Sequence, residues 1–446
     1  MLSKSLTSAA RGTLLMSTLA RSLSTIQTAP RMDLVSGPNV FASFSQQATK
    51  HGAVNLGQGF PSFAPPDFLV EAAQEAMTTP LNNQYTRPGG NPQLVQALAD
   101  YYSPKFGRNL DAMTEIATST GAQEGIWLII MALVGEGEEV VCVEPYFDAY
   151  VKAAHLGGGT ITGLPLRSTG STGTSADFEL DIPELEKTLS DKSRVLILNT
   201  PHNPTGKVFS RDELQAVADV VKKYPNLIVV ADEVYEAAVF EGLTHERFAT
   251  LDGMWERTIS VFSAGKTFSC TGWRCGYMIG PSNLITPLQG AQGVIAFAGV
   301  TPIEVAVASA FKKAEETGYF ESYAKMMEEK RDLLVNGLRD VGLEPVVPQG
   351  GYFTLCDTSA SWCDPPAGSG YSSPEHETDP LWGRRDFRVA QMFTEDAKVT
   401  GIPPSASYSP HNRDPADNLL RFAHCKEDSD LTEAVRRLKE FKASRS

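Results

Sequence analysis

The 446-residue sequence has few cysteines and none of the cysteine patterns that mark a metal site. Its six cysteines form no CxxC pair, and their spacings suit no zinc site. We therefore expect free thiols in a reducing compartment and no bound metal. Basic residues are also scarce, because 39 lysines and arginines stand against 53 acidic residues, a formal net charge of −14. This balance, without any basic stripe, argues against a nucleic-acid partner.

Long apolar runs are absent as well. No stretch is long enough to span a bilayer, so we predict no membrane association. A hydrophobic content of 42% and a charged content of 21% are typical of a globular protein. A chain of this length can bury a large core, either in two or three domains or in one large domain with a lobe.

The first 32 residues lack any acidic side chain. They carry Lys4, Arg11, Arg21 and Arg31 among many small and hydroxyl-bearing residues. A basic, hydroxyl-rich and acid-free start is typical of a mitochondrial presequence, and a disordered tail on a cytosolic enzyme is the alternative. We therefore expect residues 1–32 to be one of these, with the mitochondrial matrix as the location and the cytoplasm as the alternative.

From about residue 115 to 280, apolar runs alternate with amphipathic stretches, which indicates an α/β architecture. Four near-continuous apolar runs predict strands that are buried on both faces of a parallel sheet. They lie at residues 139–143, 194–199, 227–231 and 258–262. Residues 210–223 predict a helix that is capped by Ser210, with Glu213 three positions on.

Polar clusters directly follow three of these strands, at residues 199–206, 232–235 and 263–276. The carboxyl ends of parallel strands meet at one edge of a sheet, and ligands collect there. We therefore expect the three clusters to form one site.

The C-terminal third has a different pattern. Residues 350–355 predict a strand, and residues 431–441 predict an amphipathic helix with a start like a capping box, formed by Asp430 and Glu433. Residues 358–385 are rich in serine, glycine and proline, which predicts an exposed insertion.

The stretch SAGKTFSCTGWRCG, residues 263–276, allows three hypotheses. It is the end of a P-loop, it holds Lys266 as a covalent nucleophile, or it is a surface loop. A P-loop needs glycine at position 260, where the chain has Ser260, and a helix after the lysine, where Gly272 and Gly276 interrupt it. Nucleotide hydrolysis is therefore disfavoured.

If Lys266 forms a Schiff base with pyridoxal 5′-phosphate, the cofactor demands further groups. A carboxylate must hold the pyridine nitrogen protonated, and Asp232, at the end of an apolar strand, is the candidate. Asn203 and Tyr235 can donate hydrogen bonds to the phenolate oxygen. The local alternatives are a helix N-cap for Asp232 and a turn residue before Pro204 for Asn203.

The cofactor also needs a phosphate site and an aromatic contact. Residues 119–125, STGAQEG, open a predicted helix whose amides suit a phosphate. Ser263 and Arg274 would complete this site, and Phe147 could stack on the ring, although a core position is its alternative. The helix-start residues expected at the cofactor are Gly121, Ala122 and Gln123.

The joint order of these motifs closely resembles the class I aminotransferases of fold type I. The motifs are NQYTRPGG, STGAQEG, EPYFDAY, NTPHNPTGK, ADEVY, SAGKTFSCTGWRCG and LLRFAHCKED. Within the class, the chain is most similar to the kynurenine aminotransferase, cysteine-conjugate β-lyase and glutamine transaminase K group, of which LGQGFPSFAPPDF is typical, and nearest to its fungal-type kynurenine aminotransferases. The resemblance runs from about residue 33 to 439, and nothing is carried across residues 358–385.

The resemblance implies a large pyridoxal-phosphate-binding domain with a mostly parallel, seven-stranded sheet flanked by helices, and a smaller α+β domain. Residues 67–320 would form the large domain, and residues 33–66 and 321–446 the small one. It also implies a homodimer with shared active sites, in which Tyr85 reaches the cofactor phosphate of the neighbouring subunit. An exposed turn tyrosine is the alternative for Tyr85.

The resemblance further implies that Arg421 binds the substrate α-carboxylate with Gly59 close by, and that Phe41 and Phe297 line the side-chain pocket. Phe41 stands where some relatives have tryptophan, and Ala298 where some have histidine, which leaves the substrate preference open.

The activity implied is ping-pong transamination of kynurenine to kynurenic acid, and of other aromatic, glutamine-like or sulfur amino acids, with a 2-oxo acid acceptor. Lys266 would act as general base and acid. β-Elimination from cysteine S-conjugates, or glutamine or methionine transamination as the main activity, are alternatives. A non-catalytic regulator with the same fold is a remote one.

Overall fold

The computed structural model describes residues 28–32, 35, 39–366, 369, 371 and 379–445. The chain divides into two compact units, residues 1–37 and 38–446, and the account below concerns the second. Of the predicted presequence, residues 1–27 lie outside the described part, and Pro30–Met32 forms a single 3₁₀ turn. None of the helices in the described ranges has the length and apolar character needed to cross a membrane.

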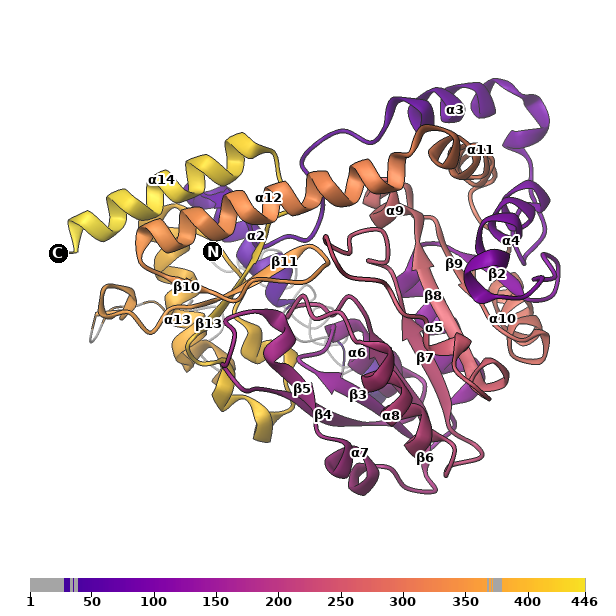
Figure 1. The fold of residues 1–446 in the computed structure, drawn as a ribbon, viewed down its shortest axis with the longest axis horizontal. Coiled ribbons are helices and arrows are strands. Elements are labelled where there is room, and N and C mark those ends of the chain that lie inside the picture. Colours follow the sequence, from indigo (N-terminus) through magenta and orange to yellow (C-terminus); the bar gives the residue numbers. More distant parts are fainter. Residues whose placement is uncertain are drawn as a thin grey trace, which may run out of the picture. The chain divides into compact units, whose positions relative to one another are not determined.

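The second unit is built on an eight-stranded sheet (Figure 1). Its order is β2 (Ile116–Ser119), β9 (Gly276–Ile279), β8 (Thr258–Ser263), β7 (Ile228–Asp232), β6 (Ser193–Asn199), β3 (Glu139–Glu144), β4 (Thr160–Ser168) and β5 (Phe178–Leu180). Strands β8, β7, β6, β3 and β4 run parallel, and β9 is antiparallel to both of its neighbours. The four predicted strands are confirmed within one residue at each end. The sheet has one strand more than the seven expected, because β5 adds a short antiparallel edge to β4.

Both faces of the sheet are buried, as the apolar runs predicted. Val140 and Cys142 of β3 pack into one hydrophobic cluster, with α5 (Ala122–Leu133) and α6 (Asp148–Leu156). Val141 and Val143 pack into another, with α7 (Ile182–Thr188) and α8 (Arg211–Val221). Successive strand residues point to opposite faces, which explains this alternation. The predicted capping box of α8 is confirmed, since Ser210 and Glu213 bond each other's backbone amides.

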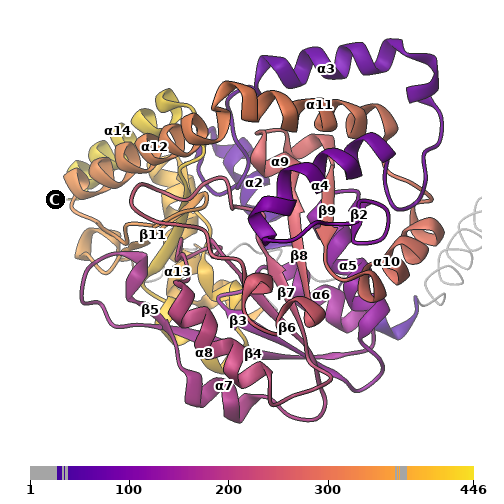
Figure 2. The ribbon, with the colours of Figure 1, turned by 45° about the vertical axis from the view of Figure 1, so that its right-hand side comes forward.

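A third group of helices packs at the β2–β9 end of the sheet (Figure 2). It comprises α3 (Asp67–Thr78), α4 (Pro92–Phe106) and α11 (Thr301–Thr317), and α10 (Ser282–Ile295) lies beside β2. All six cysteines are buried and none forms a disulfide.

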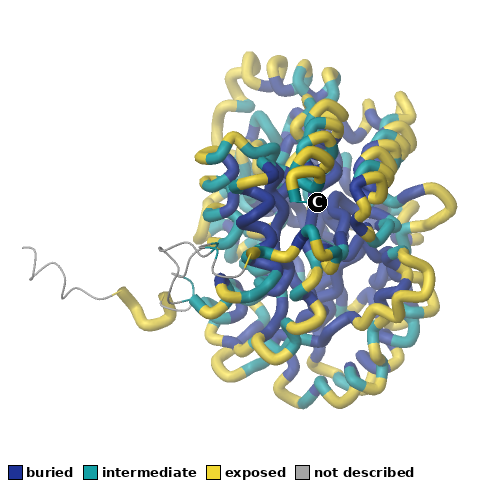
Figure 3. The backbone as a smooth tube through the Cα atoms, turned by 90° about the vertical axis from the view of Figure 1, so that its left-hand side faces the viewer, coloured by how far each residue is buried: buried dark blue, intermediate teal, exposed yellow. Residues whose placement is uncertain are grey.

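Segments from both ends of the chain form the smaller layer. β1 (Val54–Asn55) pairs in parallel with β12 (Val399–Thr400), and an antiparallel sheet has the order β10 (Glu344–Pro345), β11 (Phe353–Asp357), β13 (Leu419–Ala423). The helices are α2 (Val40–His51), α12 (Tyr319–Val341), α13 (Arg385–Met392), which continues into a π-helical turn at Phe393–Ala397, and α14 (Asp428–Ser444). Helix α12 runs alongside α14, and in Figure 3 the outer faces of the nearest helices are exposed while the interior is buried.

Three local predictions need correction. Helix α14 begins at Asp428, so Asp430 lies inside its first turn and forms no capping box. Strand β11 begins only at Phe353, because Gly351 adopts a positive φ of 81°. The expected insertion at 358–385 is not exposed at its two ends, where Cys363 and Trp382 are buried in the core of the smaller layer. Its residues 367–368, 370 and 372–378 lie outside the described part of the chain.

Candidate active site

A cavity of about 380 Å³ lies at the carboxyl ends of the parallel strands, between them and the smaller layer. Twelve of the predicted site residues line it, so the three polar clusters meet at one cavity. They are Phe41, Gly59, Ala122, Gln123, Phe147, Asn203, Asp232, Tyr235, Ser263, Lys266, Arg274 and Arg421. Gly121 directly precedes the lining residue Ala122, as the N-cap residue of α5.

Lys266 extends its amine into the cavity from α9 (Ala264–Thr267), a single helical turn that directly follows β8. Its Nζ donates a hydrogen bond of 2.5 Å to the carbonyl of Gly59 and lies 5.5 Å from the centre of the Tyr235 ring. Burial lowers the pKa of the Lys266 amine to about 8, which makes it a better nucleophile and base near neutral pH than an ordinary lysine.

Asp232 is the last residue of β7 and its side chain is buried. Its carboxylate accepts hydrogen bonds from the Tyr150 hydroxyl and from the backbone amide of Val234. Burial raises the pKa of Asp232 to about 6, outweighing these hydrogen bonds. Turns rather than a helix follow it, so the N-cap alternative is wrong. Both donors are neutral, so the carboxylate suits a cationic ligand group.

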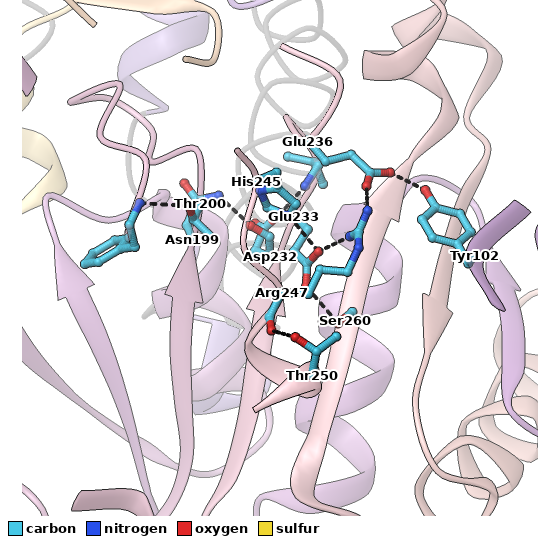
Figure 4. A network of polar contacts seen from close by, with 12 residues as sticks. Tyr102, Asn199, Thr200, Asp232, Glu233, Glu236, His245, Arg247, Thr250 and Ser260 are labelled. Carbon is cyan, nitrogen blue, oxygen red and sulfur yellow. Dashed lines mark hydrogen bonds and ion pairs between the residues drawn. The ribbon is translucent and has the colours of Figure 1, made fainter. Parts of the chain in front are cut away.

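The turn that carries Asp232 and Tyr235 is fixed from behind by a polar network (Figure 4). Arg247 is buried and donates to the carboxylates of both Glu233 and Glu236. The Glu236 carboxylate also accepts from the Tyr102 hydroxyl, and Glu233 accepts from Ser260 and pairs with His245. Glu233, Glu236 and His245 are close enough together to hold a metal ion. Because one guanidinium already pairs with both carboxylates, we interpret the three residues as part of an ion-pair network.

The part of the cavity beside the start of α5 has the hydrogen-bond donors of an anion site. Ala122 and Gln123 begin α5, where backbone amides lack helical partners, and Ser263 and the Arg274 guanidinium adjoin them. Arg274 is oriented by hydrogen bonds of 3.1 and 3.2 Å to the carbonyls of Thr271 and Thr120. Gly121 adopts a positive φ of 79°, which favours glycine, and a Cβ atom there would lie 2.4 Å from Arg274 Nη2, so a side chain would displace the guanidinium.

Arg421, on β13, is a buried cation without an anionic partner among the described residues. It donates to the carbonyl of Gly57 at 2.6 Å and to Asn203 Oδ1 at 3.3 Å, while its buried Nε bonds nothing. No acidic side chain in the described ranges forms an ion pair with it, and burial lowers its pKa to about 10. The guanidinium lies 4.0 Å from the centre of the Phe353 ring and 5.0 Å from that of Phe41. A carboxylate ligand would neutralise this charge.

Two predicted residues lie outside the cavity of their own chain. The rings of Tyr85 and Phe297 are 4.9 Å apart on the surface, where 87% and 51% of the residues' area is exposed. The prediction that Phe297 lines the pocket therefore fails within one chain, because the loop between α10 and α11 holds it at a positive φ of 67° on the surface.

Several lining residues were missed from the sequence. Tyr150 follows Phe147 by three positions, a spacing that places both on one helix face, and this signal could have identified it. Gln58 donates to the Phe41 carbonyl at 2.9 Å and so holds α2 at the cavity. Phe60 and Phe353 carry no local signal, because only the tertiary fold brings them to the site.

Comparison with known proteins agrees with this geometry. Residues 51–438 match the family "Aminotransferase class I and II". The kynurenine–oxoglutarate transaminase of Dictyostelium discoideum is 44% identical over 407 residues, which cover 89% of this chain and 93% of that protein. Kynurenine–oxoglutarate transaminase 3 of Homo sapiens is 39% identical, over 92% of this chain and 89% of that protein. The crystal structure of Bna3p of Saccharomyces cerevisiae, described there as a candidate kynurenine aminotransferase, superposes with a TM-score of 0.87 at 33% identity, over 94% of this chain and 99% of that one. The chain therefore belongs to the class I and II aminotransferase family.

Proposed function

We propose that this aminotransferase uses pyridoxal 5′-phosphate to move the amino group of kynurenine to a 2-oxo acid such as 2-oxoglutarate. One observation carries the proposal: a single cavity joins the Lys266 amine, the buried Asp232 carboxylate and the unpaired Arg421 guanidinium. The two transaminase relatives support the choice of substrates, since both are named for kynurenine and oxoglutarate.

The residues that line the cavity fit the cofactor. Asp232 would face the protonated pyridine nitrogen, and Asn203 and Tyr235 the phenolate oxygen. Phe147 would lie on the ring face, and the phosphate would take the anion site, whose residues are Gly121, Ala122, Gln123, Ser263 and Arg274. When bound, pyridoxal 5′-phosphate supplies an aldehyde that accepts the amino group and a ring that takes up the electron pair of the Cα–H bond.

Residues of this chain bind the substrates and transfer the proton. Arg421 holds the α-carboxylate of the amino acid and later that of the oxo acid, because both substrates carry this group. Lys266 Nζ takes the proton from the substrate α-carbon, for which its lowered pKa is suited. Phe41 and Phe60 offer an apolar wall to the aromatic side chain of kynurenine, and Gly59 leaves room beside it.

The visible absorption spectrum of the purified full-length protein tests the function. We expect a band of lysine-bound cofactor that disappears when kynurenine is added without an oxo acid, and returns when 2-oxoglutarate follows. If kynurenine leaves the band unchanged but glutamine or methionine removes it, glutamine or methionine would replace kynurenine as the assigned amino donor. Release of pyruvate from a cysteine S-conjugate at a higher rate would make β-elimination the main activity. A protein that takes up no pyridoxal 5′-phosphate would overturn the proposal.

The pKa of Lys266 predicts how cofactor capture depends on pH. Only the neutral amine attacks an aldehyde, and its fraction falls about tenfold for each pH unit below the pKa. With a pKa of about 8, capture should rise up to pH 8 and level off above it, whereas an ordinary lysine would still gain at pH 10. Stopped-flow absorbance of the cofactor-free full-length protein mixed with pyridoxal 5′-phosphate measures this midpoint. A capture rate that still climbs steeply between pH 9 and 10 would contradict it.

We also propose that two copies of the chain form a dimer through the surface around Tyr85 and Phe297. Apolar side chains are exposed there on neighbouring segments, namely Leu81, Tyr85, Val294, Ile295, Phe297 and Val300. Such a patch marks an interaction surface. In the dimer, Tyr85 would approach the phosphate site of the partner and Phe297 its pocket. Sedimentation equilibrium should give twice the mass of one chain, and a monomer at micromolar concentration would reject the dimer.

A further inference from the structure

The main chain of Lys266 is held by tyrosine hydroxyls. Because α9 is a single turn, the carbonyls at its end have no helical partner. The Lys266 carbonyl accepts hydrogen bonds from Tyr352, at 2.6 Å, and from Tyr323, at 3.0 Å. These two hydroxyls also contact each other at 2.5 Å, and the Thr267 carbonyl accepts from Tyr319 at 3.0 Å. Side chains from elsewhere thus cap the turn that carries the lysine.

These tyrosines come from the smaller layer. Tyr319 and Tyr323 lie one turn apart on α12, with stacked rings, and Tyr352 directly precedes β11. Tyr323 and Tyr352 are buried, and burial raises the pKa of both phenols, so they remain hydrogen-bond donors at any working pH. Because the rings are packed, removing one hydroxyl leaves the shape of the core unchanged.

The residue after Tyr352 acts on the other end of the lysine. Phe353 packs on Gly59, since a Cβ atom at Gly59 would lie 2.3 Å from Phe353 Cζ. The Gly59 carbonyl accepts the 2.5 Å hydrogen bond from Lys266 Nζ. Two consecutive residues therefore fix both ends of the lysine. Tyr352 donates to the Lys266 carbonyl, and Phe353 packs on Gly59, whose carbonyl accepts the hydrogen bond from Lys266 Nζ. The ring of Tyr352 itself lies 5.0 Å from Lys266 Nζ.

We propose that Tyr352 is a positioning residue for Lys266, and that the dipeptide Tyr352–Phe353 fixes both ends of this lysine relative to the cavity. The inference deepens the proposed function and rests on it. Tyr323 supports Tyr352, because its hydroxyl lies against both the Tyr352 hydroxyl and the Lys266 carbonyl. Without the Tyr352 hydroxyl, the turn of α9 loses its shortest anchor, and the amine spends less time at the position that faces the substrate.

The decisive comparison uses full-length Tyr352→Phe with Tyr319→Phe as its matched control. Both variants delete one tyrosine hydroxyl bound to a carbonyl of α9, but only the first anchors Lys266 itself. In Tyr352→Phe we expect capture of pyridoxal 5′-phosphate at pH 7.5 to slow about tenfold, the size of effect that one hydrogen bond produces. Its pH midpoint should rise by about one unit, because a freer amine reaches water. Tyr319→Phe should match the wild type.

Steady-state kinetics of the loaded enzymes give a second readout. Tyr352→Phe should lower kcat about tenfold and leave KM for kynurenine within about twofold, because Arg421 is untouched. If this variant does not fold, Tyr323→Phe should show the same split to a smaller extent. The inference is overturned, while the proposed function stands, if Tyr352→Phe captures pyridoxal 5′-phosphate at the wild-type rate and with the wild-type pH midpoint. It is also overturned if Tyr319→Phe loses as much capture rate and kcat as Tyr352→Phe. A wild-type protein that captures no cofactor overturns both.

Discussion

Replacing Lys266 by alanine is expected to abolish transamination, with a loss in kcat of at least about 10⁴-fold. The variant removes the amine that bonds the cofactor aldehyde and also the base that moves the α-proton. No other lysine lines the described cavity, so no neighbour can replace it. Initial rates of oxo-acid formation from kynurenine and 2-oxoglutarate measure the loss.

The control for this variant is Lys330→Met. Lys330 is also a buried lysine, but it lies on α12 and pairs with Asp428 at 2.8 Å, away from the cavity. It should keep kcat within about twofold while losing some stability. Retention of a tenth of the wild-type rate in Lys266→Ala would refute the assigned role, and would leave a binding or regulatory function of the fold as the better hypothesis.

Replacing Arg421 by glutamine is expected to lower kcat/KM about 10³-fold for both the amino acid and the oxo acid. Truncating one partner of a buried, hydrogen-bonded charge pair costs about 2–5 kcal/mol, which brackets this loss. Both half-reactions should suffer alike, because each substrate offers the same carboxylate to Arg421. Single-turnover spectroscopy, with kynurenine for one half and 2-oxoglutarate for the other, separates them.

A substrate without the carboxylate provides the control. The amine that kynurenine would give by loss of its carboxylate reaches the same pocket but cannot use Arg421. The wild type should prefer kynurenine strongly over this amine, and in Arg421→Gln the preference should nearly vanish. An unchanged preference in the variant would mean that another group binds the carboxylate.

The sequence predicted the large sheet and most of the cavity because their signals are local. Each parallel strand is a continuous apolar run, and each is followed directly by the polar residues that the sheet edge brings together, such as Asp232 and Lys266. The resemblance to a family then supplied Arg421, which by itself has the local pattern of an ordinary strand residue. The domain boundaries, the presequence and the location in the cell stay predictions.

Features that depend on distant segments could not be predicted. The start of α14 is held by Ser62, whose hydroxyl accepts from the Glu427 amide at 2.8 Å and donates to Asp430 at 2.8 Å, across more than 360 residues. The capping signal at Asp430 and Glu433 was therefore misleading. Likewise, nothing near Tyr352 or Phe353 in the sequence indicates that their side chains hold Lys266 and Arg421. Tertiary contacts of this kind override local preferences.

The pairing of β1 with β12 has a consequence for the timing of synthesis. Val54 and Asn55 meet Val399 and Thr400, which the ribosome adds about 340 residues later. At about 5–20 residues per second, the early segment must wait for about 20–70 s without its partner strand. The parallel sheet can form during this interval, but the smaller layer cannot. Until translation is almost complete, the apolar face of α2, with Phe44 and Ala48, therefore lacks the layer that buries it, and chaperones that shield such segments have this window in which to act.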